Sequence, residues 1–210
     1  MENVLVAGAN GTTGKKIINL LKASQYFNPV AMVRKEEQKE QFKKESITTV
    51  LGDLENDLSH TVENIDKVIF AAGSGGEKVI AVDQEGAKNL IDASKKANIA
   101  KFVMLSSMGA DNPKSSENLQ EYLEAKQNAD EYLKSSDLTY AIVRPGALTN
   151  GAGTGKIKLQ SKLKQQGSIT RDDVAQTLVR SLHDDAAINQ TFEIIQGDTL
   201  IGKALDEMAV

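Results

Sequence analysis

The 210-residue chain contains no cysteine, no tryptophan and only two histidines. Without cysteine it can form no disulfide, use no thiol nucleophile and bind no metal through thiolates. The two histidines, His60 and His183, lie far apart in the sequence, which argues against a histidine-rich metal site. We therefore predict no metal centre.

The chain also lacks long apolar or basic runs. No apolar run approaches the ~20 residues that a membrane-spanning helix needs, and the first one, at 4–7, is too early and too short for a signal peptide. A net charge of −4 without a basic run argues against nucleic-acid binding. We expect a cytoplasmic protein with a small-molecule substrate, without nucleic-acid or membrane partners, as a monomer or a homodimer.

The composition and length are typical of one globular domain. Hydrophobic residues make up 40% of the chain and charged residues 26%, which is ordinary for a soluble fold. The length suits a single α/β domain over residues 1–210.

The strongest positive signal is a glycine-rich turn at the start of the chain. Residues 4–7 form an apolar run typical of a buried strand, and apolar residues from Ile17 onward recur at helical spacing. A strand, a glycine turn and a helix form the context of a dinucleotide-binding fingerprint. The turn would place backbone N–H groups and the positive end of the helix dipole against phosphates. The residues predicted to bind there are Gly8, Asn10, Gly11, Thr12, Thr13 and Gly14.

Each glycine has a separate task in this interpretation. Gly8 permits the tight turn, Gly11 lets the backbone approach a pyrophosphate, and Gly14 lets the helix pack close to the strand. The spacing G-x-x-G-x-x-G is also compatible with a loop in which the glycines only permit unusual backbone conformations and bind no phosphate. The flanking strand and helix favour the phosphate site.

Arg34 follows a second predicted strand, 29–33, about twenty residues after the last glycine. At this distance an acidic residue would bind the ribose hydroxyls of NAD, whereas a basic residue would bind the extra phosphate of NADP. We therefore predict a preference for NADP(H) over NAD(H). The alternative is a solvated charge at a strand end.

Further strands are predicted at 47–51, 68–72, 102–105, 138–143 and 192–195. Ligands of open parallel sheets bind beyond the carboxyl ends of the strands. The residues predicted there are Asp53, Leu54, Ala71, Ala72, Gly73, Ser106, Pro145 and Gly146. For Asp53, the 71–73 segment and Ser106, a plain turn or capping role is the alternative. Because proline lacks an N–H, the chain is expected to stop pairing after Pro145 and to run beside the cofactor.

Tyr122 and Lys126 lie four residues apart on a predicted helix over 119–133, so they share one face. This pair suits proton transfer to a carbonyl, with Lys126 favouring the ionised phenol in a partly closed cleft. Ser107, just beyond the 102–105 strand, would hold the substrate oxygen. The alternative is that this pair is surface decoration.

Three other features are predicted from local patterns. A single long helix is expected over 79–97, with Asp83 as a structural residue. Thr170 is expected to cap a helix, with Asp173 as its partner three residues on. The glycine-rich segment 151–155 is expected to be a mobile loop.

Together the glycine turn, the 106–111 segment, Tyr122-x-x-x-Lys126 and Arg144-Pro145-Gly146 resemble the short-chain dehydrogenase/reductase superfamily. More narrowly, they resemble its atypical NAD(P)H-binding branch, near the flavin/biliverdin reductase B and NmrA-like groups. The resemblance implies a Rossmann-type, doubly wound sheet of seven parallel strands with helices on both faces. It also implies that residues 147–210 form a small C-terminal substrate lobe.

The resemblance carries over Ser107, Tyr122 and Lys126 as the catalytic trio, Lys126 also as a cofactor ligand, and Arg34 as the NADP selector. It favours an NADPH-dependent reductase of a small carbonyl or quinone-like compound. The alternative is an NADP(H)-binding redox-sensing regulator without turnover, and a third possibility is an isomerase or dehydratase with a tightly held cofactor.

Overall fold

The seven apolar runs predicted as strands form one parallel sheet in the computed structural model, which describes residues 1–208. Its strand order is β3-β2-β1-β4-β5-β6-β10, and every neighbouring pair is parallel. The strands are β1 (Glu2–Ala7), β2 (Phe27–Val33), β3 (Thr48–Leu51), β4 (Lys67–Phe70), β5 (Lys101–Leu105), β6 (Tyr140–Pro145) and β10 (Gln190–Gln196). The seven parallel strands implied by the family resemblance are confirmed.

Two antiparallel strands extend this sheet to nine. β8 (Lys156–Gln160) pairs with β10, and β11 (Thr199–Leu200) pairs with β8. β7 (Ala147–Thr149) and β9 (Ser168–Thr170) form a separate two-stranded parallel sheet. The segment predicted as a C-terminal lobe thus also contributes β8, β10 and β11 to the central sheet; residues 209–210 lie outside the described part.

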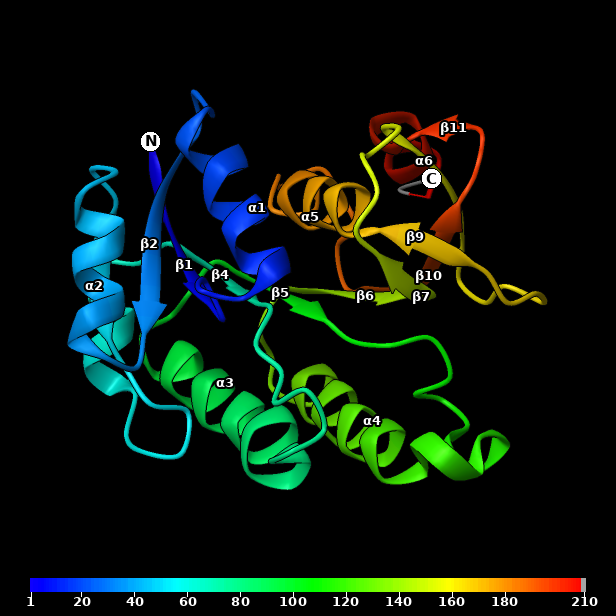
Figure 1. Ribbon diagram of the computed structural model, residues 1–210, viewed down its shortest axis with the longest axis horizontal. Coiled ribbons are helices and arrows are strands. Elements are labelled where there is room, and N and C mark those ends of the chain that lie inside the picture. The colour runs from blue at the N-terminus through cyan, green and yellow to red at the C-terminus, as the bar shows by residue number, and fades with distance from the viewer. Residues whose placement is uncertain (209–210) are drawn as a thin grey trace.

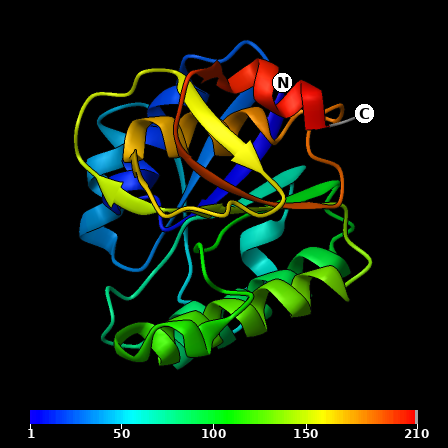
Figure 2. The same ribbon diagram turned by 90° about the vertical axis from the view of Figure 1, so that its right-hand side faces the viewer.

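Helices cover both faces of the sheet (Figure 1). α1 (Thr12–Lys22), α2 (Glu36–Lys43), α5 (Arg171–Arg180) and α6 (Ile201–Met208) contribute to the apolar core on one face. α3 (Gly86–Lys96) and α4 (Gln120–Lys134) pack on the other face. Figure 2 shows these two layers from the side, with α3 and α4 in green below the sheet.

Alternation along the strands divides the core between the two layers. Val4 and Val6 face α1 and α5, whereas Leu5 and Ala7 face α3, and all four are fully buried. A strand covered on both faces must be apolar at every position. This explains why β1 reads as a continuous apolar run instead of an alternating one.

The predicted 79–97 helix is in fact two helices. Residues Val79–Glu85 form a π-helical segment, η2, and α3 begins only at Gly86. A Cβ atom on Gly86 would lie 2.7 Å from the Leu54 Cβ, so the glycine allows close approach at this junction. Wide π turns of this kind change the direction in which side chains leave a helix. Here the altered turn contains Asp83.

Short 3₁₀ turns complete the fold at η1 (Ser59–Val62), η3 (Pro113–Ser115) and η4 (Glu117–Leu119). The predicted cap of α5 is confirmed, because the Thr170 hydroxyl accepts a hydrogen bond from the Asp173 N–H at 3.1 Å. α6 starts at Ile201.

Candidate functional site

The glycine turn brings β1, α1 and the end of β4 into close contact. Gly8 has φ +86°, and a Cβ atom there would lie 2.6 Å from the Ala72 nitrogen. A Cβ atom on Gly14 would lie 2.0 Å from the Gly8 carbonyl oxygen, a distance that no packing adjustment can relieve. Glycine is therefore required at both positions by the backbone itself.

The start of α1 leaves donors available for an anion. Gly11 is its N-cap and makes no side-chain cap, and no acidic residue lies in the first turn. The first N–H groups of a helix have no partners within the helix. Together with the helix dipole, they form an anion site beside the turn.

Two cavities meet at this turn. The first, of about 370 Å³, lies beyond the ends of β1, β2 and β3. The second, of about 810 Å³, extends toward α4. Gly11, Ala71, Ala72 and Gly73 line both cavities. An extended ligand lying across the glycine turn would occupy both of them.

Most residues predicted to bind the cofactor line one of these cavities. Those lining the first cavity are Gly8, Asn10, Gly11, Arg34, Asp53, Leu54, Ala71, Ala72 and Gly73. Those lining the second include Thr12, Thr13, Ser106 and Lys126. Gly14 is instead packed inside the turn. The Asn10 Oδ1 atom is buried without a hydrogen-bond partner. A bare glycine cradle and an unpaired polar atom are features that suit a dinucleotide.

Arg34 and Asp53 both line the first cavity. The Arg34 side chain is exposed, and its backbone N–H donates to Gln38 Oε1 at 3.0 Å. The Asp53 Oδ1 atom accepts a hydrogen bond from the Glu55 N–H at 3.1 Å. Asp53 therefore stabilises its own turn, as the alternative interpretation expects, while still lining the cavity.

Tyr122 and Lys126 lie together on the wall of the second cavity, as their spacing predicts. The Lys126 Nζ atom is 5.6 Å from the centre of the Tyr122 ring. Lys126 is only 4% exposed. The ammonium and the phenol are thus neighbours in a partly closed site.

Lys126 has a carboxylate partner that the sequence interpretation treated as structural. Its Nζ atom lies 3.1 Å from the Asp83 Oδ1 atom. Burial favours the neutral amine, but the neighbouring Tyr122 and Asp83 side chains outweigh burial and raise the pKa of Lys126 above its ordinary value. The lysine is therefore a cation in this site.

A second buried ion pair lies beneath the cavity, one helical turn after Lys126. The Asp130 Oδ2 atom accepts hydrogen bonds from the Arg144 Nε atom and the Ser106 hydroxyl, both at 2.9 Å. Burial raises the pKa of the Asp130 carboxyl, although Arg144 and Ser106 favour its charged form. Sequence reasoning missed this network, yet the four-residue spacing from Lys126 to Asp130 is a signal that could have indicated it.

Ser107 does not join Tyr122 and Lys126. It lines neither cavity, and its hydroxyl donates to the Met108 carbonyl at 3.2 Å. Ser106 lines the second cavity instead, with its hydroxyl bound to Asp130. The structure thus brings together two of the three predicted catalytic side chains.

β6 ends at Pro145, as expected, and its last register pair with β10 is Pro145 with Ile194. The N–H of Gly146 completes this pair by donating to the Ile194 carbonyl at 2.9 Å, and from Ala147 the chain pairs with β9. A Cβ atom on Gly146 would lie 2.2 Å from the Gly167 oxygen. Pro145 and Gly146 line neither of the two cavities. This close packing against Gly167 is sufficient to require a glycine at position 146. The sequence alone could not distinguish this packing from contact with a cofactor.

The loop at 151–155, expected to be mobile, is held by the first turn of α5. Asp173 Oδ1 accepts hydrogen bonds from the Thr154 and Gly155 N–H groups at 3.0 and 2.8 Å. Asp172 accepts one from Gly153 and forms an ion pair with Lys16 of α1 at 2.6 Å. The loop is therefore anchored between α1 and α5.

Within residues 1–208, no group of three or more histidine, aspartate or glutamate side chains is arranged to hold a metal ion. None of the helices in this part of the chain has the length and hydropathy needed to cross a membrane.

Comparisons with known proteins agree with this geometry. Residues 8–185 match a family described as NAD(P)H-binding. An uncharacterized sugar epimerase of Bacillus subtilis, YhfK, is 38% identical, covering 98% of this chain and 99% of that protein. A putative NAD-dependent epimerase/dehydratase from Bacillus halodurans is 40% identical over 99% of this chain and 100% of its own, with a TM-score of 0.94.

A reductase is also among the similar structures. ChuY, an anaerobillin reductase from Escherichia coli O157:H7, is 25% identical with a TM-score of 0.83, covering 93% of this chain and 98% of its own. The family and its neighbours are NAD(P)-dependent oxidoreductases or epimerases. The glycine turn, the two adjoining cavities and these matches lead to one conclusion: the chain belongs to the NAD(P)H-binding family of atypical short-chain dehydrogenase/reductases.

Proposed function

We propose that the chain is an NADPH-dependent reductase of a small carbonyl or quinone-like compound. The observation that carries the proposal is the position of Tyr122 and Lys126 on the wall of the second cavity, which shares the glycine turn with the first. A dinucleotide with its diphosphate at the Gly11–Thr13 amides would extend into both cavities. The similarity to a reductase, ChuY, supports this direction of reaction.

Each residue has a defined task in this proposal. The amides at the start of α1 bind the diphosphate, and Arg34 binds the phosphate that distinguishes NADPH from NADH. The bound cofactor would supply a hydride to the carbonyl carbon. Tyr122 would donate its phenolic proton to the carbonyl oxygen, and Lys126 would stabilise the phenolate that remains.

The test is NADPH oxidation against a panel of aldehydes, ketones and quinones, with Tyr122→Phe as the variant. Loss of the proton donor should lower kcat by about 10²–10⁴-fold, while the Kd for NADPH stays close to the wild-type value, because the amides at the start of α1 and Arg34 make the phosphate contacts. Tyr132→Phe is the matched control. Tyr132 is on the same helix, but its hydroxyl donates to Asp92 at the surface.

If Tyr122→Phe turns over at the wild-type rate, Tyr122 is not the proton donor. A lack of NADPH oxidation with every compound would count against the reductase and favour the second candidate.

The second candidate is an NADP(H)-binding regulator that senses the redox state of its cofactor without turnover. The observation in its favour is the absence of Ser107 from both cavities, which leaves the predicted trio incomplete. Such a protein should bind NADPH and NADP⁺ with Kd values that differ by about tenfold or more, which corresponds to at least 1.4 kcal/mol. Calorimetric titrations with each form measure this difference.

A further inference from the structure

Asp83 and Lys126 form an ion pair that is almost completely shielded from water. Asp83 is 2% exposed and Lys126 is 4% exposed, and the Oδ1 and Nζ atoms are 3.1 Å apart. The two residues come from different elements, η2 and α4. The tertiary fold therefore creates this contact.

A buried ammonium needs such a partner to remain charged. Desolvation penalises the charged form, and lysines buried without a carboxylate lose their proton at much lower pH than free lysine. Removal of one partner from a buried pair also leaves an uncompensated charge in the interior. Asp83 is the carboxylate that pairs directly with the buried Lys126 ammonium.

The second oxygen of Asp83 fixes the carboxylate in place. Asp83 Oδ2 accepts hydrogen bonds from the Ser74 N–H at 3.0 Å and from the Ser74 hydroxyl at 2.8 Å. Ser74 belongs to the segment after β4 that lines the first cavity. The carboxylate therefore joins that segment to the lysine of the second cavity.

The π-helical turn of η2 contains Asp83, one turn before α3 begins at Gly86. A Cβ atom on Gly73, next to Ser74, would lie 3.2 Å from the Asp83 Oδ1 atom, so a larger side chain there would press on the carboxylate. The segment after β4 and the η2 turn thus both pack closely against Asp83.

Other charged groups surround Lys126 but are engaged elsewhere or are more exposed. Asp130 is bound to Arg144 and to the Ser106 hydroxyl. The other titratable or charged groups that line the second cavity are Tyr122, Glu117, Glu121 and Arg171. α4 also carries Glu124, Glu131, Tyr132 and Lys134, none of which lines this cavity. Of the carboxylates in the described part of the chain, Asp83 is the one in direct contact with the Lys126 ammonium.

We propose that Asp83 is a positioning residue that keeps the Lys126 ammonium charged and directed at the Tyr122 side of the second cavity. Its link to Ser74 ties this arrangement to the segment that borders the first cavity. The inference rests on the proposed function, since it assigns a task within the same site. It nevertheless concerns the protein without ligand and can be tested in that state.

The experiment follows the Lys126 Cε and Nζ signals of ¹³C,¹⁵N-lysine-labelled protein by NMR between pH 6 and 11. Lys126→Met identifies the signal by its loss. In wild-type protein the signal should not titrate below about pH 10. In Asp83→Asn, which keeps the shape of the side chain but removes its charge, the midpoint should fall by about one pH unit or more.

Two control variants separate the ion pair from other effects. Ser74→Ala removes hydrogen bonds to the same carboxylate but leaves its charge, so the Lys126 midpoint should stay within about half a pH unit of wild type. Asp92→Asn removes an exposed carboxylate on α3 and should leave the midpoint unchanged. Asp83→Glu retains the charge, so its Lys126 midpoint should lie between those of Asp83→Asn and wild type.

A wild-type midpoint below about pH 9 would overturn the proposal without the need for any variant, because Lys126 would then not be held as a cation. An unchanged midpoint in folded Asp83→Asn would overturn it as well. If Asp83→Asn does not fold, the wild-type and Asp83→Glu titrations decide the matter.

A binding series then links the charge to the site. The Kd of Asp83→Asn for NADPH should weaken progressively as Lys126 loses its proton, by about tenfold between pH 7 and pH 10 relative to wild type. If the ratio of the Asp83→Asn Kd to the wild-type Kd does not change with pH, the charge of Lys126 does not contribute to NADPH binding. The NMR result stands apart from turnover, so a protein that reduces nothing can still support or overturn the role of Asp83.

Discussion

At the scale of single residues, the site depends on where charge is held. Lys126 is a buried cation because Asp83 faces it, while Asp130 is held by Arg144 behind the cavity. Arg34 differs from these residues because it is exposed at the mouth of the first cavity. A cation in that position can bind a phosphate without a large desolvation cost.

Replacement of Arg34 by alanine should reduce the preference for NADPH over NADH by about 10–100-fold, because a hydrogen bond to a charged group contributes about 1.5–3 kcal/mol. The Kd for NADH should change little. Fluorescence titrations of both cofactors measure the ratio. Lys35→Ala, which removes the neighbouring exposed cation outside the first cavity, is the matched control. If the ratio is unchanged in Arg34→Ala, another residue selects the cofactor.

For single residues, sequence patterns predict contacts within one helix but not contacts between distant elements. The four-residue spacing of Tyr122 and Lys126 fixes their common face, because helix geometry alone determines it. The partner of Lys126 is 43 positions away in the chain, and only the packing of η2 against α4 brings it near. Ser106 and Ser107 are adjacent and both follow the end of β5, yet only Ser106 lines the second cavity. Which of them faces the cavity depends on the path of the chain beyond the strand, which the sequence alone left undecided.

At the scale of elements, strands buried on both faces were predictable because every position in them must be apolar. β8 and β11 were less predictable, since β8 alternates in burial and β11, at the edge of the sheet, has only two residues. The π-helical turn of η2 was missed because its apolar spacing imitates an ordinary helix. Tertiary contacts, and not local propensity, select that turn.

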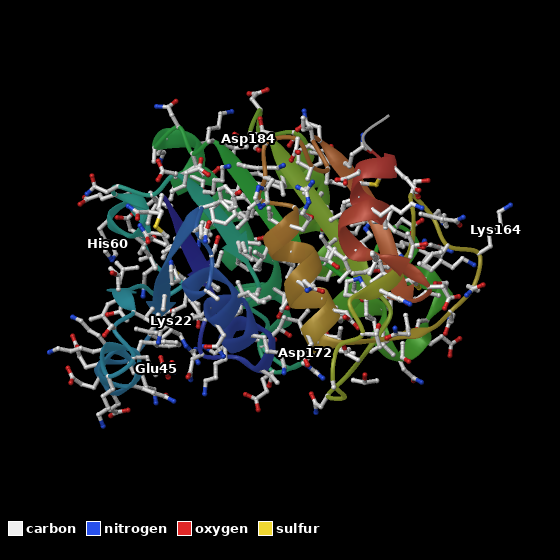
Figure 3. All side chains as sticks on the ribbon, turned by 90° about the horizontal axis from the view of Figure 1, so that it is seen from above. Lys22, Glu45, His60, Lys164, Asp172 and Asp184 are labelled. Atoms are coloured by element: carbon white, nitrogen blue, oxygen red, sulfur yellow. The ribbon has the colours of Figure 1, made fainter. Side chains whose placement is uncertain are left out.

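α5 lies between β9 and β10 in the chain. Figure 3 shows Asp172 and Asp184 near opposite ends of this helix. Its first residue, Arg171, lines the second cavity. Beyond its other end, two buried lysines at the starts of β4 and β5 bind backbone carbonyls of the following turn: Lys67 donates to Leu182, and Lys101 donates to His183 and Ala186. Cations are favourable at this end of a helix.

The two lysines are paired in register but differ in their partners. Burial, and then the nearby charge of Lys67, lowers the pKa of Lys101 to about 8. Burial also acts against the Lys67 cation, but hydrogen bonds to the Asp184 and Glu2 carboxylates outweigh it and raise the pKa of Lys67. The same fold thus disfavours one charge and stabilises the other.

We expect these two lysines to give opposite pH dependences of stability. Between pH 8 and the ordinary lysine value, the unfolded chain binds the Lys101 proton more tightly than the native protein, so the native state gains stability as pH rises. The free energy of unfolding of wild type minus that of Lys101→Met should therefore rise in this window, by up to about 1.4 kcal/mol per pH unit. Denaturant titrations at several pH values measure it.

Lys67→Met is the matched control. Because the pKa of Lys67 is raised, its contribution is complete below the ordinary lysine value and is lost only at higher pH. The corresponding difference for Lys67 should stay level through the window. If the free energy of unfolding of wild type minus that of Lys101→Met also stays level, the pKa of Lys101 is not lowered in the native protein.

At the scale of the whole molecule, the sheet, the glycine turn and the two cavities form one arrangement. The order β3-β2-β1-β4-β5-β6-β10 places β1 and β4 side by side, and the turn after β1 meets the end of β4 there. Strand order could be anticipated from the family resemblance. The joining of two cavities across residues 71–73 could not, because it depends on how α4 and the segment after β4 close around the sheet.

The central claim is that one dinucleotide crosses the glycine turn and reaches Tyr122 and Lys126. A crystal structure of the complex with NADPH tests it most directly. The account predicts the diphosphate at the amides of Gly11–Thr13, the adenosine phosphate beside Arg34, and the nicotinamide in the second cavity facing Tyr122. A complex with the nicotinamide outside the second cavity, or with the diphosphate away from the glycine turn, would contradict it.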